Sequence, residues 1–358
     1  MNEFVFNFRQ FIFAREYRGY SQSDLSKNIK GLSQPNLSKF EKGLGMISDE
    51  LLQKIILFLD FPETFFHKKI NNYIDNAHYR KRATISKKEK NEIEYTLRLA
   101  GYIVDEMSDS IEWPEFNLKP LNVEDGYSPE NIAKFARKFF NIKPNEPVRD
   151  INKLLESHGV VIVEIDNIEK FDGVSLLTDN GIPLVVINKS FSNDRKRFTL
   201  AHELGHLLMH ICGNFPISDY RDTKEIEKEA NLFASEFLMP KDSIKNSLYG
   251  LKLSDLVSLK SYWLTSMQSI IRRSFDLNCI DKNKYGYLNM EFSRGGNRKN
   301  EGYDVFIDNP VLFNKAYKLF KEDLNYTKNE LAESFSLPID VIDRYFSIDR
   351  SSKLKIIV

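Results

Sequence analysis

The chain has 358 residues, which is too many for one ordinary hydrophobic core, so two or three domains are expected. Its hydrophobic content of 42% excludes a largely disordered chain. The sequence contains no run of about 18 apolar residues, which argues against a membrane-spanning helix. The two cysteines, Cys212 and Cys279, are too few for a disulfide framework and favour a reducing, cytoplasmic location.

The formal net charge of zero argues against a chain that binds nucleic acid over its whole surface. The charge is unevenly distributed, however, because residues 1–90 contain 16 Lys and Arg but 10 Asp and Glu. A positive excess at one end fits contact with DNA phosphates, and it also fits a solvated helix face. The charge pattern therefore allows DNA binding at the N-terminal end without requiring it.

Residues 1–66 have a helical apolar pattern and no strand signal. Ser21 is a suitable N-cap for one short helix, Gly31 is suited to a turn, and Ser33 followed by Pro35 predicts the start of a second helix. The segment SQSDLSKNIKGLSQPNLSKFEKG resembles the Cro/repressor-type (XRE) helix-turn-helix, including its closing Phe-Glu-Lys-Gly. The resemblance implies an all-α domain that binds double-stranded operator DNA.

The second of these helices is expected to turn polar side chains outward while Leu37 and Phe40 face the core. Gln and Asn suit contacts to adenine in the major groove, and Lys suits guanine or phosphate. The predicted DNA-contacting residues of the domain are Gln22, Ser33, Gln34, Asn36, Ser38 and Lys39. The alternative is a helical bundle of the same topology that binds protein instead.

Residues 67–126 are expected to form a partly helical connector, with a basic helix from about Ser86 to Met107. Residues 127–275 then combine helices with a small sheet, beginning at a helix start at Ser128 and Pro129. Beta-branched runs predict strands and apolar stripes predict long helices: strands near 160–165, 173–177 and 183–187, and helices near 193–211 and 223–238. We expect this domain to fold without the residues that precede it.

Residues 276–358 contain no motif that indicates chemistry. A strand-like patch is expected from Tyr285 to Phe292, followed by a helical region. The region is either a sensor or docking module, or packing that closes the preceding domain.

The motif Ala-His-Glu-Leu-Gly-His at residues 201–206 is the strongest functional signal in the chain. His202 and His206 are four residues apart, so on a helix both imidazoles can reach one tetrahedral Zn²⁺ ion. Glu203 follows the first histidine, where it can act as a general base. The protein has six histidines, and three of them, including His210, fall within nine residues, which makes a chance match improbable.

A catalytic zinc needs a third protein ligand and an open fourth position. The metzincin pattern is excluded, because it requires glycine and histidine where this chain has Met209 and Cys212. A downstream helix offers four glutamates instead: Glu225, Glu227, Glu229 and Glu236. Glu227 is favoured because it shares a face with the small residues Ala230 and Ala234, whereas Glu229, the second choice, shares its side with apolar residues.

The segments AHELGHLLMH and EKEANLFASEFLMP resemble the ImmA/IrrE family of gluzincin-type metallopeptidases over residues 128–240. The resemblance implies an α+β fold, with a small sheet and zinc-binding helices behind the all-α helix-turn-helix domain. It also implies that His202, His206 and Glu227 bind Zn²⁺ and that Glu203 is the general base. Members of this family cleave a helix-turn-helix repressor, which releases transcription of stress or mobile-element genes.

Three further features have more than one interpretation. His210 could stabilise the oxyanion that develops at the scissile carbonyl, or it could hold a zinc ligand by a hydrogen bond. It could equally be a capping histidine near the C-terminus of a helix. Cys212 is more plausibly an inert buried thiol than a redox switch. A substrate peptide could add to the strand at residues 183–188 or to its neighbour at residues 173–177, and either strand could instead only pack.

Two functions are therefore open. The first is a cytoplasmic zinc protease that is tethered to operator DNA, cleaves a protein substrate such as a repressor, and could act as a homodimer. The second is a non-enzymatic DNA-binding regulator or antitoxin whose zinc site is structural. Glu203 favours the first function, because a structural site has no use for a general base and normally has a fourth protein ligand.

Overall fold

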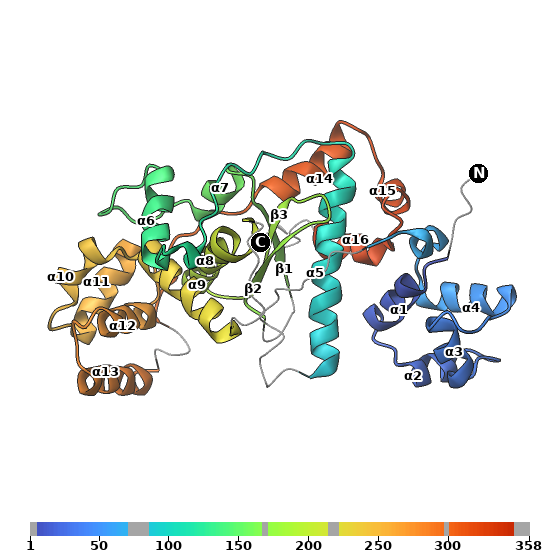
Figure 1. Ribbon diagram of the computed structural model, residues 1–358, viewed down its shortest axis with the longest axis horizontal. Helices are drawn as coiled ribbons and strands as arrows, with labels where there is room; N and C mark the ends of the chain where they lie inside the picture. The colour runs from blue at the N-terminus through green and yellow to red at the C-terminus, as the bar shows by residue number, and fades with distance from the viewer. Residues whose placement is uncertain (1–5, 71–85, 167–170, 214–221, 297–300, 347–358) are drawn as a thin grey trace, which may run out of the picture.

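The computed structural model describes residues 6–70, 86–166, 171–213, 222–296 and 301–346 (Figure 1). Helices α1 to α4 form a unit at one end, a small sheet lies in the middle, and helices α10 to α13 lie at the other end. The expected fold class is confirmed: an all-α N-terminal region precedes a domain with a three-stranded sheet and many helices. None of the described helices is both long and apolar enough to cross a membrane.

The N-terminal unit consists of α1 (Phe8–Tyr17), α2 (Gln22–Asn28), α3 (Gln34–Glu41), α4 (Asp49–Leu59) and a 3₁₀ turn, η1 (Glu63–His67). The two expected caps are present: Ser21 forms a capping box with Asp24, and the Ser33 side chain accepts from Asn36 N. The turn between α2 and α3 contains Gly31 at φ +94°, a conformation that glycine adopts without strain.

Helix α5 (Lys87–Ser108) lies within the predicted connector, but it does not behave as a simple spacer. It packs against α1 and β3, and its apolar face belongs to the same core as the N-terminal unit. The hydroxyl of Tyr102 donates to the carbonyl of Phe335, and that of Tyr345 donates to the carbonyl of Thr96. These contacts tie α5 to the sheet and to the C-terminal helices, and independent folding of residues 127–275 stays a prediction.

Helices α6 (Pro129–Phe139) and α7 (Ile151–Glu156) precede the three strands, β1 (Val161–Ile165), β2 (Gly173–Leu177) and β3 (Pro183–Asn188). The sheet order is β1-β3-β2, with β3 parallel to β1 and antiparallel to β2. Successive residues of β3 point to opposite faces, so Val186 belongs to the core with α5 and Val185 belongs to the core with α8 and α9. Because β3 is central, the expectation that it could accept a substrate strand is wrong, while β2 does lie at an edge.

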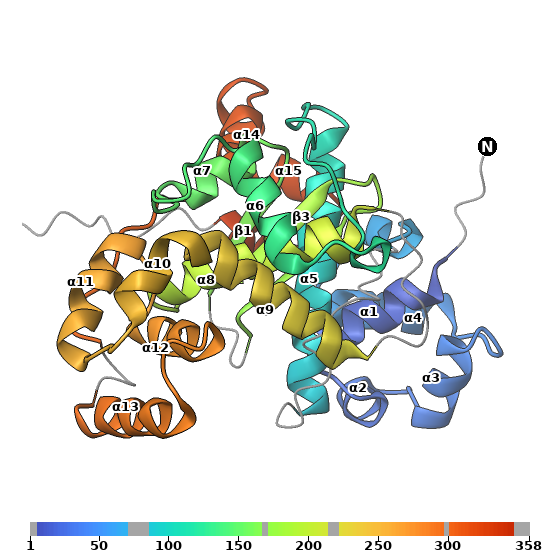
Figure 2. The ribbon, with the colours of Figure 1, turned by 60° about the vertical axis from the view of Figure 1, so that its left-hand side comes forward.

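Helix α8 (Asn193–His206) continues through a π-helical turn, η4 (Leu207–Ile211), and α9 (Thr223–Leu238) crosses it closely (Figure 2). Both helices were expected from the sequence. Gly205 permits the close approach, since a Cβ atom at this position would lie 3.0 Å from the Phe233 ring. The crossing brings the polar residues of the two helices together.

Helices α10 (Lys241–Leu248), α11 (Leu253–Trp263), α12 (Met267–Asp276) and α13 (Lys282–Arg294) follow. The expected strand at residues 285–292 is wrong, because this stretch lies within α13. The Asp281 side chain caps the helix by accepting from Lys284 N, and Leu288 and Phe292, four residues apart, bury one face.

The C-terminal helices α14 (Leu312–Glu322), α15 (Lys328–Ser334) and α16 (Ile339–Phe346) pack near β1 and α5. Two buried or half-buried carboxylates fasten this region to the sheet domain. Glu156 accepts from the backbone N–H groups of Val311 and Leu312, and Asp308 caps α7 by accepting from the backbone of Asn152 and Lys153. The region is therefore continuous with the sheet domain, and a sensor or docking role stays a prediction.

Candidate metal centre and nucleic-acid interface

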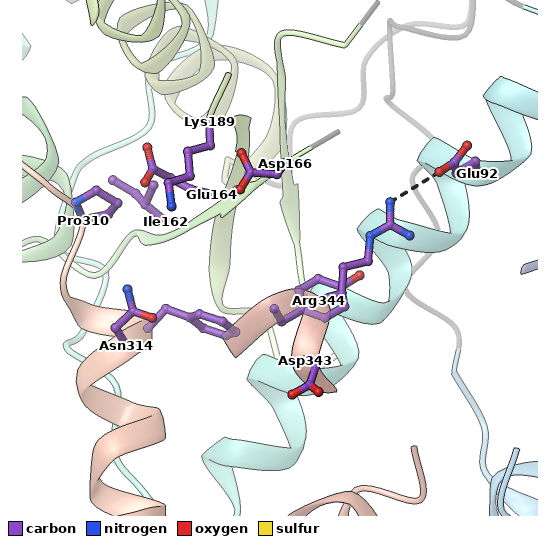
Figure 3. A pocket seen from close by; sticks show the side chains of 11 residues that line it. Glu92, Ile162, Glu164, Asp166, Lys189, Pro310, Asn314, Asp343 and Arg344 are labelled. Carbon is purple, nitrogen blue, oxygen red and sulfur yellow. Dashed lines mark hydrogen bonds and ion pairs between the residues drawn. The ribbon is translucent and has the colours of Figure 1, made fainter. Parts of the chain in front are cut away.

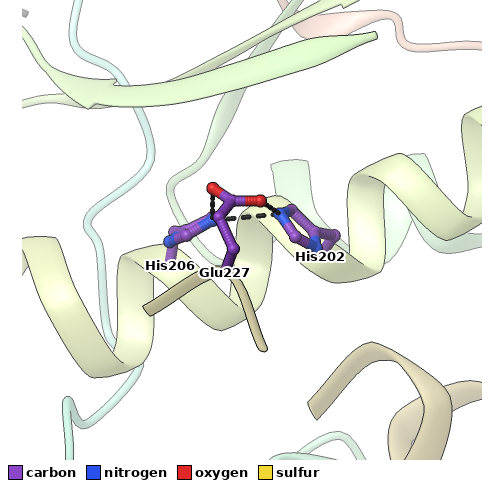
Figure 4. A group of neighbouring side chains, drawn as sticks. All are labelled: His202, His206 and Glu227. Atoms are coloured by element: carbon purple, nitrogen blue, oxygen red, sulfur yellow. Dashed lines mark hydrogen bonds and ion pairs between the residues drawn. The ribbon is translucent and has the colours of Figure 1, made fainter. Parts of the chain in front are cut away.

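His202 and His206 on α8 face Glu227 on α9 (Figure 4). The two Nε2 atoms are 3.0 Å apart, and the oxygens of Glu227 lie 3.4 Å from each of them. Ligand atoms held 2.0–2.1 Å from a tetrahedral ion are separated by about 3.3 Å. The three side chains therefore fit a zinc ion, and they leave room for a fourth ligand.

The protonation states of these residues also suit a cation. Burial lowers the pKa of His206 to about 3, so its imidazole is neutral near pH 7. Burial acts to raise the pKa of Glu227, but hydrogen bonds from the two histidines outweigh burial and hold it well below its usual range. For His202, burial acts to lower the pKa, and the nearby carboxylates of Glu227 and Glu203 raise it overall.

The three candidate zinc ligands, His202, His206 and Glu227, are called the zinc triad below. Glu203 lies on α8 beside the zinc triad and is buried. The hydroxyl of Ser175 on β2 donates to its Oε2 atom at 2.7 Å. Burial raises the pKa of Glu203, which brings the carboxyl group closer to the range in which a general base works at neutral pH. The arrangement ties the candidate base to an edge strand of the sheet.

His210 lies in the π-helical turn and does not join the triad directly. Its Nδ1 atom is 3.0 Å from Nδ1 of His206, and its Nε2 atom is 2.9 Å from Oε2 of Glu229. These two contacts fit one tautomer of each ring. Nδ1–H of His206 donates to Nδ1 of His210, and Nε2–H of His210 donates to Glu229. The π-helical turn places His210 one turn beyond His206, and such turns occur frequently at functional sites.

Glu229, the second choice for the third ligand, therefore contacts His210, which in turn contacts His206. The sequence contained a partial signal for these contacts, since His210 lies one helical turn beyond His206 and Glu229 is a polar residue on an otherwise apolar side of its helix. The signal was ambiguous, because helical spacing alone cannot tell which glutamate reaches which histidine.

Comparison with known families agrees with this geometry. Residues 155–275 match the peptidase family model described as the IrrE N-terminal-like domain, and residues 13–66 match the model described as a helix-turn-helix. The chain thus carries an IrrE N-terminal-like domain behind a helix-turn-helix. No curated protein matches the chain. All residues of the triad, together with Glu203 and His210, lie within the matched IrrE N-terminal-like segment.

Other polar residues of the IrrE N-terminal-like domain have different partners. Glu236 is buried in an ion pair with Arg273, and Glu225 is exposed. Burial raises the pKa of Cys212 to about 12, so little thiolate exists at neutral pH and a redox role is disfavoured.

A groove of about 1180 Å³ opens beside the triad. Phe198 on α8 and Glu227 and Asn231 on α9 line it, as do Ser266, the N-cap of α12, and Arg272 within α12. The groove is large enough for an extended peptide and lies next to the residues that would hold zinc.

The helix-turn-helix presents its expected residues in different ways. Gln34, Asn36 and Lys39 are exposed on α3, and Ser38 is half-buried. Ser33 is exposed, but its hydroxyl caps α3. Gln22 accepts from the Gln34 amide and donates to Glu41, which is itself paired with the buried Arg15. This last network orients Gln34 at the start of the helix.

Proposed function

We propose that the chain is a zinc-dependent endopeptidase that binds operator DNA and cleaves a helix-turn-helix repressor, thereby releasing transcription of stress or mobile-element genes. The observation that carries the proposal is the convergence of His202, His206 and Glu227 beside the buried carboxyl of Glu203. Among the described residues, the cluster offers three ligands and an adjacent base, which is the composition of a catalytic zinc site and not of a structural one.

His202, His206 and Glu227 would hold zinc, which supplies Lewis acidity toward the scissile carbonyl when bound. Glu203 accepts a proton from the attacking water and returns it to the leaving amine as the peptide bond breaks. Ser175 holds one oxygen of that carboxylate, so the other oxygen is directed toward the water. The chain therefore supplies both the proton transfer and the orientation of the group that performs it.

His210 and Glu229 are proposed to position His206 and not to touch the substrate. The Nδ1 contact fixes the ring of His206 so that Nε2 points at the zinc position. The carboxylate of Glu229 in turn keeps His210 in the tautomer that can accept from His206. Of the three roles that the sequence left open for His210, these contacts support the one in which it holds the zinc ligand His206 by a hydrogen bond.

A substrate segment is proposed to add to the outer edge of β2. Two hydrogen bonds show which residues of this segment direct their backbone groups toward β3. Asn188 N donates to the carbonyl of Asp172, and Thr178 N donates to the carbonyl of Ile182. Alternate residues, including Ser175, then direct their backbone groups to the outer edge, beside Glu203. The rest of the peptide would continue into the groove along α9.

The helix-turn-helix is proposed to bring the protease to its substrate at an operator. A repressor bound to the same DNA would then be present at a high effective concentration, which raises the cleavage rate without additional contacts. The exposed polar face of α3 supports the DNA-binding half of this proposal. A homodimer would allow two such helices to contact adjacent half-sites.

The proposal can be tested by identifying the substrate in cells. Cells that carry Glu203→Gln should accumulate a helix-turn-helix repressor that disappears when the unaltered protein is present. The matched control is Glu225→Gln, which changes an exposed glutamate on α9 and should behave like the unaltered protein. If no protein differs in abundance between the Glu203→Gln and control cells, the proposed protease function is wrong.

A further inference from the structure

A second cavity, of about 600 Å³, lies where the N-terminal unit meets α5, away from the zinc triad. Helix α1 and the lower part of α5 lie side by side in both views of the molecule (Figures 1 and 2). The start of α1, the segment after α3, the segment after η1 and α5 each contribute side chains to the cavity. Neither the zinc chemistry nor the polar face of α3 uses this cavity.

The cavity is strongly basic. Arg9, Lys42 and Lys69 line it, are exposed, and have no ion pair with any residue that the structure describes. Two further cations line it but are already engaged, because Lys68 is paired with Glu106 and Arg98 donates to a backbone carbonyl. Three positive charges are therefore left uncompensated.

The one lining carboxylate among the described residues, that of Glu41, does not balance these charges. Arg15 binds both of its oxygens, at 2.6 and 3.0 Å, and the Gln22 amide donates to it as well. Glu41 is thus fully used inside the helix-turn-helix and contributes little negative potential to the cavity.

Gln10 provides an independent indication of a ligand. Its residue is 1% exposed and lines the cavity, yet its side-chain nitrogen has no hydrogen-bond partner among the described residues. A buried donor that stays unsatisfied costs about 1–3 kcal/mol, so such groups are usually explained by water or by a ligand. Because this nitrogen is itself shielded from solvent, an acceptor oxygen in the cavity would satisfy the amide after a rotation of the Gln10 side chain toward the cavity.

A cavity of similar volume elsewhere in the chain lacks these properties (Figure 3). It lies between β1, α5, α14 and α16, and it contains both acidic and basic side chains. Three of its carboxylates, those of Glu92, Glu164 and Asp343, each have a cationic partner. A basic excess is therefore not a general feature of the cavities in this protein.

We propose that the cavity at the junction of α1 and α5 binds a phosphate group. Guanidinium and ammonium groups together with an amide donor form the set of contacts that phosphate oxygens accept. The phosphate could belong to the DNA backbone or to a free phosphorylated molecule, because both offer the same oxygens. In the second case, the ligand would lie on the contact between the DNA-binding unit and the helix that leads to the peptidase domain.

The test uses the full-length protein and a variant that combines Arg9→Gln, Lys42→Gln and Lys69→Gln. Gln10→Leu removes the buried donor at similar volume, and Lys54→Gln is the control, since Lys54 is an exposed lysine on α4 paired with Glu50. Thermal melting of each variant checks that the fold is retained. Two probes are then measured: a short duplex of random sequence at several salt concentrations, and inorganic pyrophosphate by equilibrium dialysis.

If the DNA backbone is the ligand, the slope of log affinity against log salt should fall by about two to three in the triple variant, because each phosphate contact contributes about 0.9. If a free phosphorylated molecule is the ligand, pyrophosphate should bind the parent saturably, bind the triple variant at least about tenfold more weakly, and bind Gln10→Leu several-fold more weakly. Either result supports the proposal. The proposal is overturned if the triple variant matches Lys54→Gln in both the salt slope and the pyrophosphate affinity.

Discussion

Replacing Glu229 by glutamine tests the proposed support for the zinc ligand His206. The substitution keeps the shape of the side chain but removes the charge that Nε2 of His210 contacts at 2.9 Å. The carboxylate is largely shielded from solvent, with a side-chain exposure of 16%, so screening by water weakens the interaction little. A weaker hold on His210 should leave His206 less well oriented.

The expected effect is a 10- to 100-fold loss of zinc affinity, the range typical for partners of metal-bound histidines. This corresponds to about 1.4–2.7 kcal/mol. Glu227→Gln is the matched comparison, because it makes the same chemical change two residues away on a side chain that faces both Nε2 atoms. It should lower the affinity much further, since it alters one of the three ligands.

Zinc affinity can be measured by competition with a chromophoric chelator, with circular dichroism as a check on the fold. Two results would refute the reasoning. Equal zinc affinity in Glu229→Gln and the parent would mean that the hydrogen bonds that link Glu229 through His210 to His206 do not support the metal site. A loss in Glu229→Gln as large as that in Glu227→Gln would mean that Glu229 is a ligand itself.

Three other outcomes are expected. Gly205→Ala places a Cβ atom 3.0 Å from the ring of Phe233 and should destabilise the protein by about 1–3 kcal/mol in urea unfolding; an unchanged midpoint would contradict the close helix crossing. Burial raises the pKa of Asp105 from 3.8 to about 6, so the parent protein loses stability as the pH rises through this range and the carboxyl group ionises. The stability of Asp105→Asn relative to the parent should therefore increase by about 1 kcal/mol, discounted for screening, between about pH 4 and pH 6. A stability difference that does not change with pH would argue against the raised pKa. Gln34→Ala and Asn36→Ala should each weaken specific operator binding by about 1–3 kcal/mol in a mobility-shift titration, whereas equal affinity would favour the protein-binding bundle.

Local patterns predicted the elements whose signals lie within a few residues. The caps Ser21 and Ser33 and the positions of α8 and α9 follow from side-chain chemistry and helical spacing alone. The motif at residues 201–206 predicted that two imidazoles share one helix face, and they do. Spacing also favoured Glu227, because small neighbours allow two helices to approach; Glu227 does face both histidines, and its role as a zinc ligand stays a prediction.

Features that depend on distant partners could not be predicted in this way. The run at residues 183–188 is apolar in any case, and only pairing with β1 and β2 makes it central instead of an edge strand. The aromatic residues of α13 alternate over a few positions, a pattern that is also typical of a strand. The N-cap Asp281 is the local feature that indicates a helix instead. The packing of α5 and the contact between His210 and Glu229 likewise arise from tertiary structure.

The most direct test of the zinc protease is the behaviour of purified Glu203→Gln with the repressor identified in cells. The glutamine can still accept from Ser175, so the site should keep its shape and bind one zinc per chain by elemental analysis. Cleavage of the repressor should fall by about 10²–10⁴-fold, because the general base is lost. A variant with full zinc occupancy and undiminished cleavage would contradict the role of Glu203 as general base. A variant that binds no zinc would contradict the assignment of Glu203 as a base that is not itself a metal ligand.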